Sequence, residues 1–280
     1  MTPTVAQSLL SAQARGLARI DAQRLLLHVL GRDPHERAWL LAHDLDRLTP
    51  AQAARLGELC DRRLQGEPVA YLVGQKNFHG LDLAVDARVL DPREDTETLV
   101  DWALACIPPG QACRVADLGT GSGAVALSLG ARRPLAEITA TDISADALAV
   151  ARANGERLGV TVRWRQGRWY QPLAGECFDV IVSNPPYIAE GDPHLPALRH
   201  EPRTALVSGA DGLDDLRRIV AGAPAHLRPN GWLLLEHGWD QAAAVRELLR
   251  SAGLQIVESR LDSAGIERCS GGRWPGSRMG

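Results

Sequence analysis

The first 75 residues place apolar side chains at the spacing of helices. Apolar positions recur three and four residues apart, as at Leu25, Leu26, Val29 and Leu30. Gly31 then supplies a stop, and Thr49 followed by Pro50 is typical of a helix start, with threonine as cap and proline at the first helical position. The pattern predicts a small helical unit over residues 1–75, which needs a partner surface or a neighbouring domain.

The pattern changes in residues 76–95. Apolar and polar residues alternate over residues 81–86, which predicts a strand. Pro92 breaks the extended segment, and a new helix begins with Asp95 or Thr96 as its cap. We therefore interpret residues 76–95 as a linker between two domains.

From residue 96 to residue 280, strands and helices alternate. Short apolar or alternating runs predict strands at residues 114–118, 137–142, 160–165, 178–182 and 232–236. Helical patterns follow the first two strands, the second helix opening at Ser144, and recur near residues 212–226 and 240–252. This alternation predicts an α/β fold, a parallel sheet with helices on both faces. In such sheets, ligands bind outside the carboxyl ends of the strands.

A glycine-rich turn, Asp-Leu-Gly-Thr-Gly-Ser-Gly at residues 117–123, lies at one of these strand ends. Glycines let the backbone approach a ligand closely, and the free N–H groups of the following helix favour a carboxylate or a phosphate. Gly119, Gly121 and Ala124 also satisfy a loose dinucleotide pattern. The turn alone does not separate a nicotinamide cofactor from S-adenosylmethionine, and a tight turn without a ligand is the plainer alternative.

Asp142 ends the next predicted strand and is a second indication of which ligand the glycine turn binds. A carboxylate at this position can accept both ribose hydroxyls of an adenosine. Its alternative role is to cap the following helix, which Ser144 could do instead. The turn together with Asp142 indicates a nucleoside cofactor without saying which one.

A second unusual stretch, Asn-Pro-Pro-Tyr at residues 184–187, follows the apolar run at 178–182. Prolines end a strand and fix the backbone. Methyl transfer to an amide nitrogen needs acceptors that orient its NH₂ group, and the side-chain oxygen of Asn184 and the backbone carbonyl of Pro185 are suitable. Tyr187 offers an aromatic face for a planar group. The alternative is a proline-rich turn that only ends the strand.

Composition narrows the class of protein further. Of 280 residues, 45% are hydrophobic and 23% charged, and the formal net charge of −3 gives no global positive field for nucleic acid. Five cysteines without a C-x-x-C pair favour a reducing cytoplasm over a disulfide framework. We see no signal peptide, no apolar run of the roughly 18 residues of a membrane helix, and no metal-binding motif, and therefore expect neither membrane nor metal.

Taken together, these motifs resemble the bacterial peptide chain release factor N5-glutamine methyltransferases, which use S-adenosylmethionine. The resemblance spans nearly the whole chain and rests on segments at 67–71, 78–79, 90–97, 117–123, 183–188, 201–206, 233–239 and 267–268. The Asn-Pro-Pro-Tyr stretch alone is shared with DNA and RNA amino methyltransferases. Its combination with the helical region and the Leu-Glu-His-Gly segment at 235–238 is more specific.

The resemblance implies a five-helix-like N-terminal domain (1–75), a hairpin linker (76–95) and a Rossmann-like methyltransferase domain (96–280) with a mostly parallel seven-stranded sheet. It implies an S-adenosylmethionine site at Gly119, Thr120, Gly121, Ser122, Gly123, Asp142, Trp169 and Asn184. Within this site, the turn would cradle the amino-acid part, Asp142 would hold the ribose and Trp169 would pack near the adenine. The substrate glutamine would bind at Asn184, Pro185, Pro186 and Tyr187, with Asn184, Pro185 and Tyr187 as the catalytic group.

The resemblance also implies the partner. The methyl acceptor would be the glutamine of the Gly-Gly-Gln loop in class 1 release factors, and the N-terminal domain would grip the release factor. We expect a monomer that forms no stable complex with nucleic acid.

Two departures from the family pattern concern charge. Arg168 stands where the family usually carries aspartate, which removes an acceptor for the adenine amino group. Asp91 and Glu94 replace the isoleucine and second proline of the family's Ile-Pro-Arg-Pro stretch.

The alternatives to a glutamine methyltransferase are a nucleic-acid amino methyltransferase, a nicotinamide-dependent oxidoreductase, and a binding module that has lost its cofactor.

Overall fold

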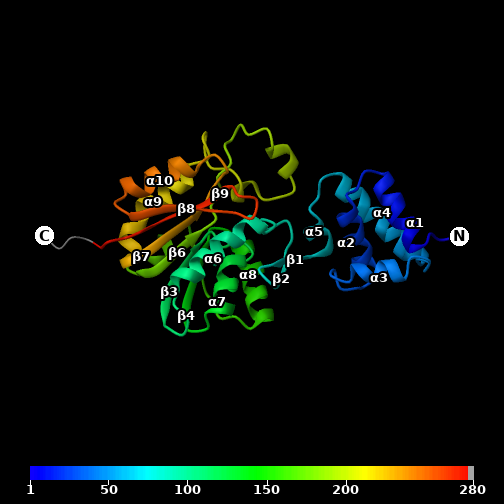
Figure 1. Cartoon of the computed structure of the whole chain (residues 1–280), viewed down its shortest axis with the longest axis horizontal. Helices are drawn as coiled ribbons and strands as arrows, with labels where there is room; N and C mark the ends of the chain where they lie inside the picture. The colour runs from blue at the N-terminus through cyan, green and yellow to red at the C-terminus, as the bar shows by residue number, and fades with distance from the viewer. Residues whose placement is uncertain (277–280) are drawn as a thin grey trace. The chain divides into compact units, whose positions relative to one another are not determined.

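The computed structural model describes residues 1–276, which form two compact units (Figure 1). The first unit is Met1–Gln75, and the second begins at Lys76.

The first unit is all-helical, as the apolar spacing predicts. Its helices are α1 (Val5–Ala14), α2 (Arg19–Val29), α3 (Arg37–Ala42), α4 (Pro50–Leu64) and α5 (Val69–Val73). Thr49 caps α4 in a capping box with Gln52, and Pro50 occupies the first turn. The core gathers leucines from several of these helices, with Leu25, Leu26 and Leu27 of α2 fully buried.

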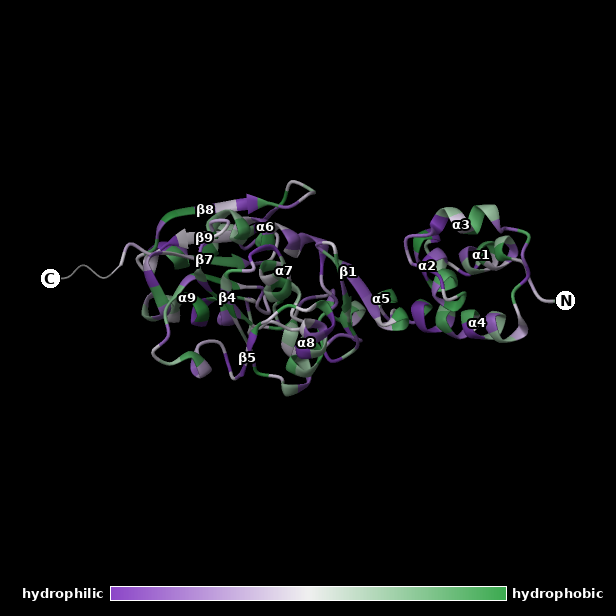
Figure 2. Ribbon diagram, turned by 90° about the horizontal axis from the view of Figure 1, so that it is seen from below, coloured by the Kyte–Doolittle hydropathy of each residue, from purple (hydrophilic) through white to green (hydrophobic). Residues whose placement is uncertain are grey.

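A two-stranded hairpin, β1 (Gln75–Phe78) and β2 (Leu81–Ala84), follows the helical unit. Its first strand is hydrophilic and appears purple in Figure 2. The Asn154 side chain accepts a hydrogen bond from Ala84 N (2.7 Å) and donates one to Ala84 O (3.0 Å), which fixes the hairpin within the second unit.

The second unit is built on a seven-stranded sheet. Its strands are β3 (Cys113–Leu118), β4 (Ala136–Asp142), β5 (Arg163–Gln166), β6 (Phe178–Ser183), β7 (Leu227–Glu236), β8 (Gln255–Leu261) and β9 (Glu267–Arg273). They lie in the order β5-β4-β3-β6-β7-β9-β8. The pairs from β5 to β7 are parallel, and β9 pairs antiparallel with both of its neighbours. The predicted α/β class and mostly parallel sheet are confirmed.

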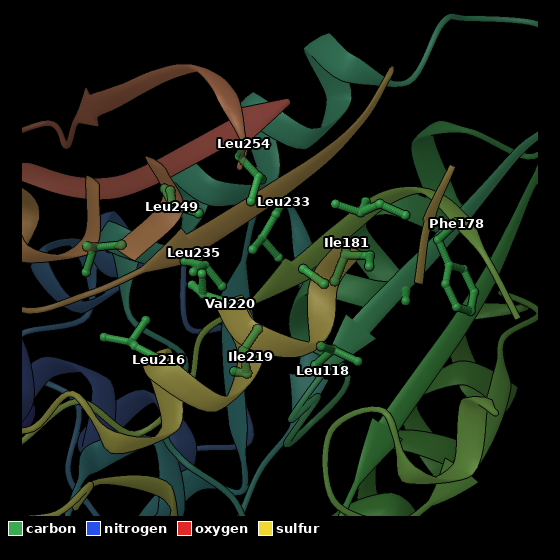
Figure 3. Packing of buried hydrophobic residues seen from close by; sticks show 14 of the residues in the cluster. Leu118, Phe178, Ile181, Leu216, Ile219, Val220, Leu233, Leu235, Leu249 and Leu254 are labelled. Atoms are coloured by element: carbon green, nitrogen blue, oxygen red, sulfur yellow. The ribbon is translucent and has the colours of Figure 1, made fainter. Parts of the chain in front are cut away.

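Helices cover both faces of this sheet (Figure 1). They are α6 (Glu97–Cys106), α7 (Ala124–Arg132), α8 (Ala145–Leu158), α9 (Asp214–His226) and α10 (Ala242–Ser251). Single 3₁₀ turns occur at Glu94–Thr96, Gln171–Leu173, Leu195–Leu198 and Arg203–Ala205. Figure 3 shows α9 side chains such as Leu216 and Ile219 packed with Ile181, Leu233 and Leu235 of the central strands in one buried cluster. This packing makes the central strands a rigid base for the loops at their carboxyl ends.

Two local expectations are corrected. The strand expected at 160–165 is β5, Arg163–Gln166, because the backbone N–H of Val160 bonds to Gly155 O (3.0 Å) as part of the end of α8. Thr96 does stand at the cap position of α6, but its side chain makes no capping hydrogen bond. The Thr96 hydroxyl instead accepts a hydrogen bond from Asn184, in the candidate site described below.

Candidate active site

The candidate site lies where the strand order reverses. The chain runs from β3 outward through β4 to β5 and returns to β6 on the other side of β3. The ends of β3 and β6 are therefore neighbours, and the Ser183 hydroxyl donates to Leu118 O at 2.6 Å. The glycine turn and the Asn-Pro-Pro-Tyr segment start from these adjacent ends, where ligands bind in open α/β sheets.

The glycine turn is held in a left-handed backbone conformation that favours glycine. The φ angles of Gly119, Gly121 and Gly123 are +75°, +56° and +84°. The N–H groups of Gly119 and Thr120 both donate to Thr141 O, at 2.8 and 2.9 Å, which ties the turn to β4.

The buried Asp117 carboxylate stabilises the turn through hydrogen bonds. One oxygen of its carboxylate accepts from the Thr120 hydroxyl (2.6 Å) and from Ala126 N (3.2 Å). Burial raises the pKa of Asp117 to about 7, against the lowering effect of these two hydrogen bonds.

Asp142 faces the turn from the end of β4. Its Oδ2 accepts from Gly121 N and its Oδ1 from Ser144 N, both at 2.9 Å. Ser144, not Asp142, caps α8 by accepting from Ala147 N (3.1 Å). Burial raises the pKa of Asp142, although its backbone hydrogen bonds partly offset this. Each carboxylate oxygen can accept a further hydrogen bond, so the ribose assignment is chemically possible.

Trp169 packs directly on the glycine turn. A Cβ atom added at Gly119 would lie 2.9 Å from the Trp169 ring, so only glycine allows this approach. Trp169 itself has a positive φ of 49°, and its Nε1 is buried without a hydrogen-bond partner. A buried indole N–H of this kind usually finds an acceptor, and here a bound ligand could supply one.

Arg168 is not an unpaired cation facing the site. It donates to Asp215 Oδ1 at 2.9 Å, and Arg218 donates to the same oxygen at 2.8 Å. The other oxygen of Asp215 accepts from the Ser208 hydroxyl at 3.0 Å. The charge of Arg168 is therefore paired with a carboxylate of α9, and both residues line the candidate cavity described below.

The negative charge of Asp91, the second departure from the family pattern, is also paired with basic side chains. The buried carboxylate of Asp91 pairs with Lys76 (3.5 Å) and Arg93 (3.6 Å). Arg93 also pairs with the buried Glu201, whose other oxygen accepts from Asp91 N at 3.3 Å. The segment around residues 91–93 is therefore fixed to the loop at Glu201.

The Asn-Pro-Pro-Tyr segment differs from expectation at its tyrosine. Asn184 Nδ2 donates to Thr96 Oγ1 at 3.1 Å, and Pro185 and Pro186 are buried. Tyr187, expected to offer its aromatic face to a planar group, is half-buried against the core, and its hydroxyl donates to Glu236 Oε1 at 3.2 Å. Since a buried phenol needs a hydrogen-bond partner, Glu236 accounts for its inward position.

Sequence reasoning did not assign Glu236, Thr96 or Asp215 to the site. Glu236 ends β7, is fully buried, and has no partner for Oε2. Burial raises its pKa to about 7, and the facing hydroxyls of Thr96 and Tyr187 lower it in part. A carboxylate directly after an apolar strand was the available signal, because strand ends lie side by side in this fold.

One cavity of about 360 Å³ unites most of the predicted residues. Its lining includes Gly119, Thr120, Gly121, Ser122, Asp142, Trp169, Asn184 and Pro186. Gly123, Pro185 and Tyr187 do not line it, whereas Thr96, Arg168 and Asp215 do. The volume suits a small-molecule ligand, and the lining combines apolar walls with a few fixed polar groups.

Residues 1–276 carry the features that bear on metal binding and membrane insertion. They contain no cluster of three or more histidine, cysteine or acidic side chains placed to hold a metal ion. None of their helices has the length and apolar character to cross a membrane.

Comparison with known proteins identifies the class. The family described as "Methyltransferase small domain" matches residues 98–201, and that described as "PrmC N-terminal domain" matches residues 4–74. A solved methyltransferase from Pyrococcus furiosus, 22% identical, has a similar fold with a TM-score of 0.55 over 78% of this chain and 98% of its own. Fold and site together define a protein of the Rossmann-like methyltransferase class.

Relatives at higher identity give the family. A release factor glutamine methyltransferase of Xylella fastidiosa is 52% identical over 96% of this chain and 98% of its own length. One of Bordetella pertussis is 55% identical over 92% and 95%. The chain belongs to the release factor glutamine methyltransferase family.

A pair of glycine variants tests the close approach of Trp169 to the turn. Both positions have a left-handed backbone, which strains an alanine. In Gly119→Ala the new methyl group would also clash with the Trp169 ring, whereas in Gly121→Ala no atom lies within 4 Å of it. We expect Gly121→Ala to lower the free energy of unfolding by about 1 kcal/mol and Gly119→Ala by about 1–3 kcal/mol more. Urea unfolding followed by circular dichroism measures both. Equal losses would show that the indole does not restrict the turn.

The buried Glu236 carboxylate should make stability depend on pH. Because its folded pKa of about 7 lies above the ordinary value of 4.5, the folded state holds a proton that the unfolded state has released, and stability falls as pH rises between these values. Glu236→Gln removes this loss. We expect its free energy of unfolding, relative to the wild type, to rise by on the order of 1–3 kcal/mol from pH 4.5 to 7 and then to level off.

Urea unfolding of both proteins at several pH values measures this difference. The exposed Glu156 on α8 provides the matched control, since Glu156→Gln should show no such rise. A difference between Glu236→Gln and the wild type that stays constant with pH would contradict the assignment.

Proposed function

We propose that this protein transfers the methyl group of S-adenosylmethionine to the side-chain amide nitrogen of the glutamine in the Gly-Gly-Gln motif of class 1 translation termination release factors. The single observation that carries the proposal is the shared cavity, which Asn184, the glycine turn and Asp142 line together. Membership of the release factor glutamine methyltransferase family supports the same reaction.

The residues present fit the cofactor. The turn at Gly119, Thr120, Gly121 and Ser122, with left-handed glycines, and the start of α7 after Gly123 suit the cofactor's amino-acid part. Asp142 suits its ribose hydroxyls. Trp169 would flank the adenine, and its unpartnered Nε1 offers a donor. When bound, S-adenosylmethionine supplies a methyl group on a sulfonium, which is open to attack by a nucleophile.

Asn184 and Pro185 would orient the substrate amide. An amide nitrogen is a poor nucleophile, because its lone pair is delocalised into the carbonyl. The Asn184 side-chain oxygen and the Pro185 carbonyl can accept the two NH₂ hydrogens and so hold the nitrogen in line with the methyl group. They also stabilise the positive charge that develops on the nitrogen as the bond forms.

Pro186 and Tyr187 would complete the substrate site in different ways. Pro186 lines the cavity and gives the planar amide an apolar wall. Tyr187 does not line the cavity, and its hydroxyl bonds to Glu236, so its contribution is to fix the end of the segment that carries Asn184. A strong base at the amide is unnecessary, since the proton can leave after methyl transfer.

Further parts of the proposal concern the rest of the chain. The helical residues 1–75 would recognise the release factor, the hairpin region 76–95 would link them to the catalytic residues from 96 onward, and the protein would act as a monomer in the cytoplasm. The formal net charge of −3 supports a protein substrate over a stable complex with nucleic acid. The nucleic-acid and nicotinamide alternatives are not favoured, because the close relatives are release factor glutamine methyltransferases.

Labelled methyl transfer tests the substrate. The protein is mixed with methyl-labelled S-adenosylmethionine and a class 1 release factor, and the reaction is repeated with the Gly-Gly-Gln glutamine changed. We expect label on the unchanged release factor only. Label that persists on the changed release factor would exclude this glutamine as the acceptor, and labelling of a DNA or RNA duplex instead would revive the nucleic-acid alternative.

Asn184→Ala tests the role of the side-chain amide. Because the lost interaction aims the nucleophile, we expect kcat to fall by about 10²-fold or more. Calorimetry with S-adenosylhomocysteine should show that cofactor affinity largely persists. Turnover at the wild-type rate would mean that Asn184 does not position the substrate.

A further inference from the structure

Thr96 occupies an unusual position for a buried hydroxyl. It ends the 3₁₀ turn Glu94–Thr96, is 4% exposed, and still lines the cavity. It stands at the cap position of α6 without making a capping hydrogen bond. Its oxygen accepts instead from Asn184 Nδ2, 88 residues away in sequence (3.1 Å).

The turn that carries Thr96 is fixed from both sides. Arg268 of β9 pairs with the neighbouring Asp95 and with Asp262, each at 3.3 Å. On the other side of Thr96, the Glu97 carboxylate accepts from His79 N at 2.7 Å. The Thr96 hydroxyl therefore has little freedom to follow a moving Asn184.

When it is ionised, Glu236 favours one orientation of the Thr96 hydroxyl hydrogen. The two groups face each other, and Glu236 Oε2 is a buried acceptor with no partner. A hydroxyl has one hydrogen and two lone pairs. When its hydrogen is directed toward the carboxylate, only lone pairs remain for Asn184, and these can receive an N–H but not a carbonyl oxygen.

An asparagine amide has a donor end and an acceptor end, and its two flipped orientations differ only in hydrogen bonding. If the amide turned over, Asn184 would present Nδ2 to the NH₂ of a substrate amide, and two donors would face each other. The correct orientation therefore needs a neighbour that accepts from Nδ2, and Thr96 supplies it.

We propose that Thr96 is a positioning residue for methyl transfer, which acts by binding Asn184 Nδ2 so that Asn184 Oδ1 faces the cavity as the acceptor for the substrate NH₂. In its ionised form, Glu236 accepts the Thr96 hydrogen and so keeps Thr96 as an acceptor toward Asn184. This inference rests on the proposed function for its substrate, but the hydrogen bond itself can be tested without turnover.

Three variants separate positioning from folding. Thr96→Val keeps the shape and removes the hydroxyl, Thr96→Ser keeps the hydroxyl, and Thr96→Val in an Asn184→Ala background removes the proposed target. We expect Thr96→Val to lower kcat by about 10- to 100-fold while KM and the affinity for S-adenosylhomocysteine change less than about threefold. Thr96→Ser should retain most of the wild-type kcat. Thermal unfolding checks that each variant is folded.

The double variant supplies the decisive comparison. If Thr96 acts through Asn184, adding Thr96→Val to Asn184→Ala should cause almost no further loss of kcat. A further loss equal to that in the wild-type background would overturn the inference, because it would show an independent or merely structural role. A single Thr96→Val variant with kcat within twofold of the wild type would do the same.

Nuclear magnetic resonance tests the geometry without any substrate. The side-chain NH₂ signal of Asn184, assigned by its loss in Asn184→Ala, should exchange slowly with solvent in the wild type and Thr96→Ser, and faster in Thr96→Val. Equal exchange in all three would overturn the inference. A wild-type protein that keeps the slow exchange but does not label the release factor would overturn the proposed function alone.

Discussion

The pairing of β3 with β6 is the constraint on which the site depends. It sets the glycine turn and the Asn-Pro-Pro-Tyr segment at adjacent strand ends, and the bond from the Ser183 hydroxyl to Leu118 O (2.6 Å) fixes those ends together. A reaction between a bound cofactor and an amide needs both within a few ångströms in a fixed orientation. Buried leucines and isoleucines from α9 and the central strands hold the pairing in place.

Buried polar groups around this pairing are supported from several elements. Asp117 and Asp142 hold the turn through hydrogen bonds to its hydroxyl and backbone groups, and Glu236 holds Tyr187. Burial raises the pKa of all three carboxyls, so each is held at a cost to stability when it ionises. The protein thus gives up some stability for fixed acceptors around the cavity, as functional sites commonly do.

Several features of the fold could be predicted because they depend on local chemistry. The Thr49-Pro50 start of α4 follows from capping geometry, and the buried strands follow from short apolar runs bounded by turns. The position of β5 could not be predicted as well, since the end of α8 competes for Val160. The inward position of Tyr187 was also missed, because nothing near it in sequence indicates its partner Glu236.

The sequence by itself determined the class of the fold, the glycine turn with its carboxylate, and the amide-bearing segment after β6, because each is written in consecutive residues with a local physical meaning. Only the tertiary structure decided that Thr96 contacts Asn184, that Asp215 pairs with Arg168, and that Lys76 pairs with Asp91. These contacts join residues far apart or on separate elements. They depend on strand order and helix packing, which no local pattern of residues specifies.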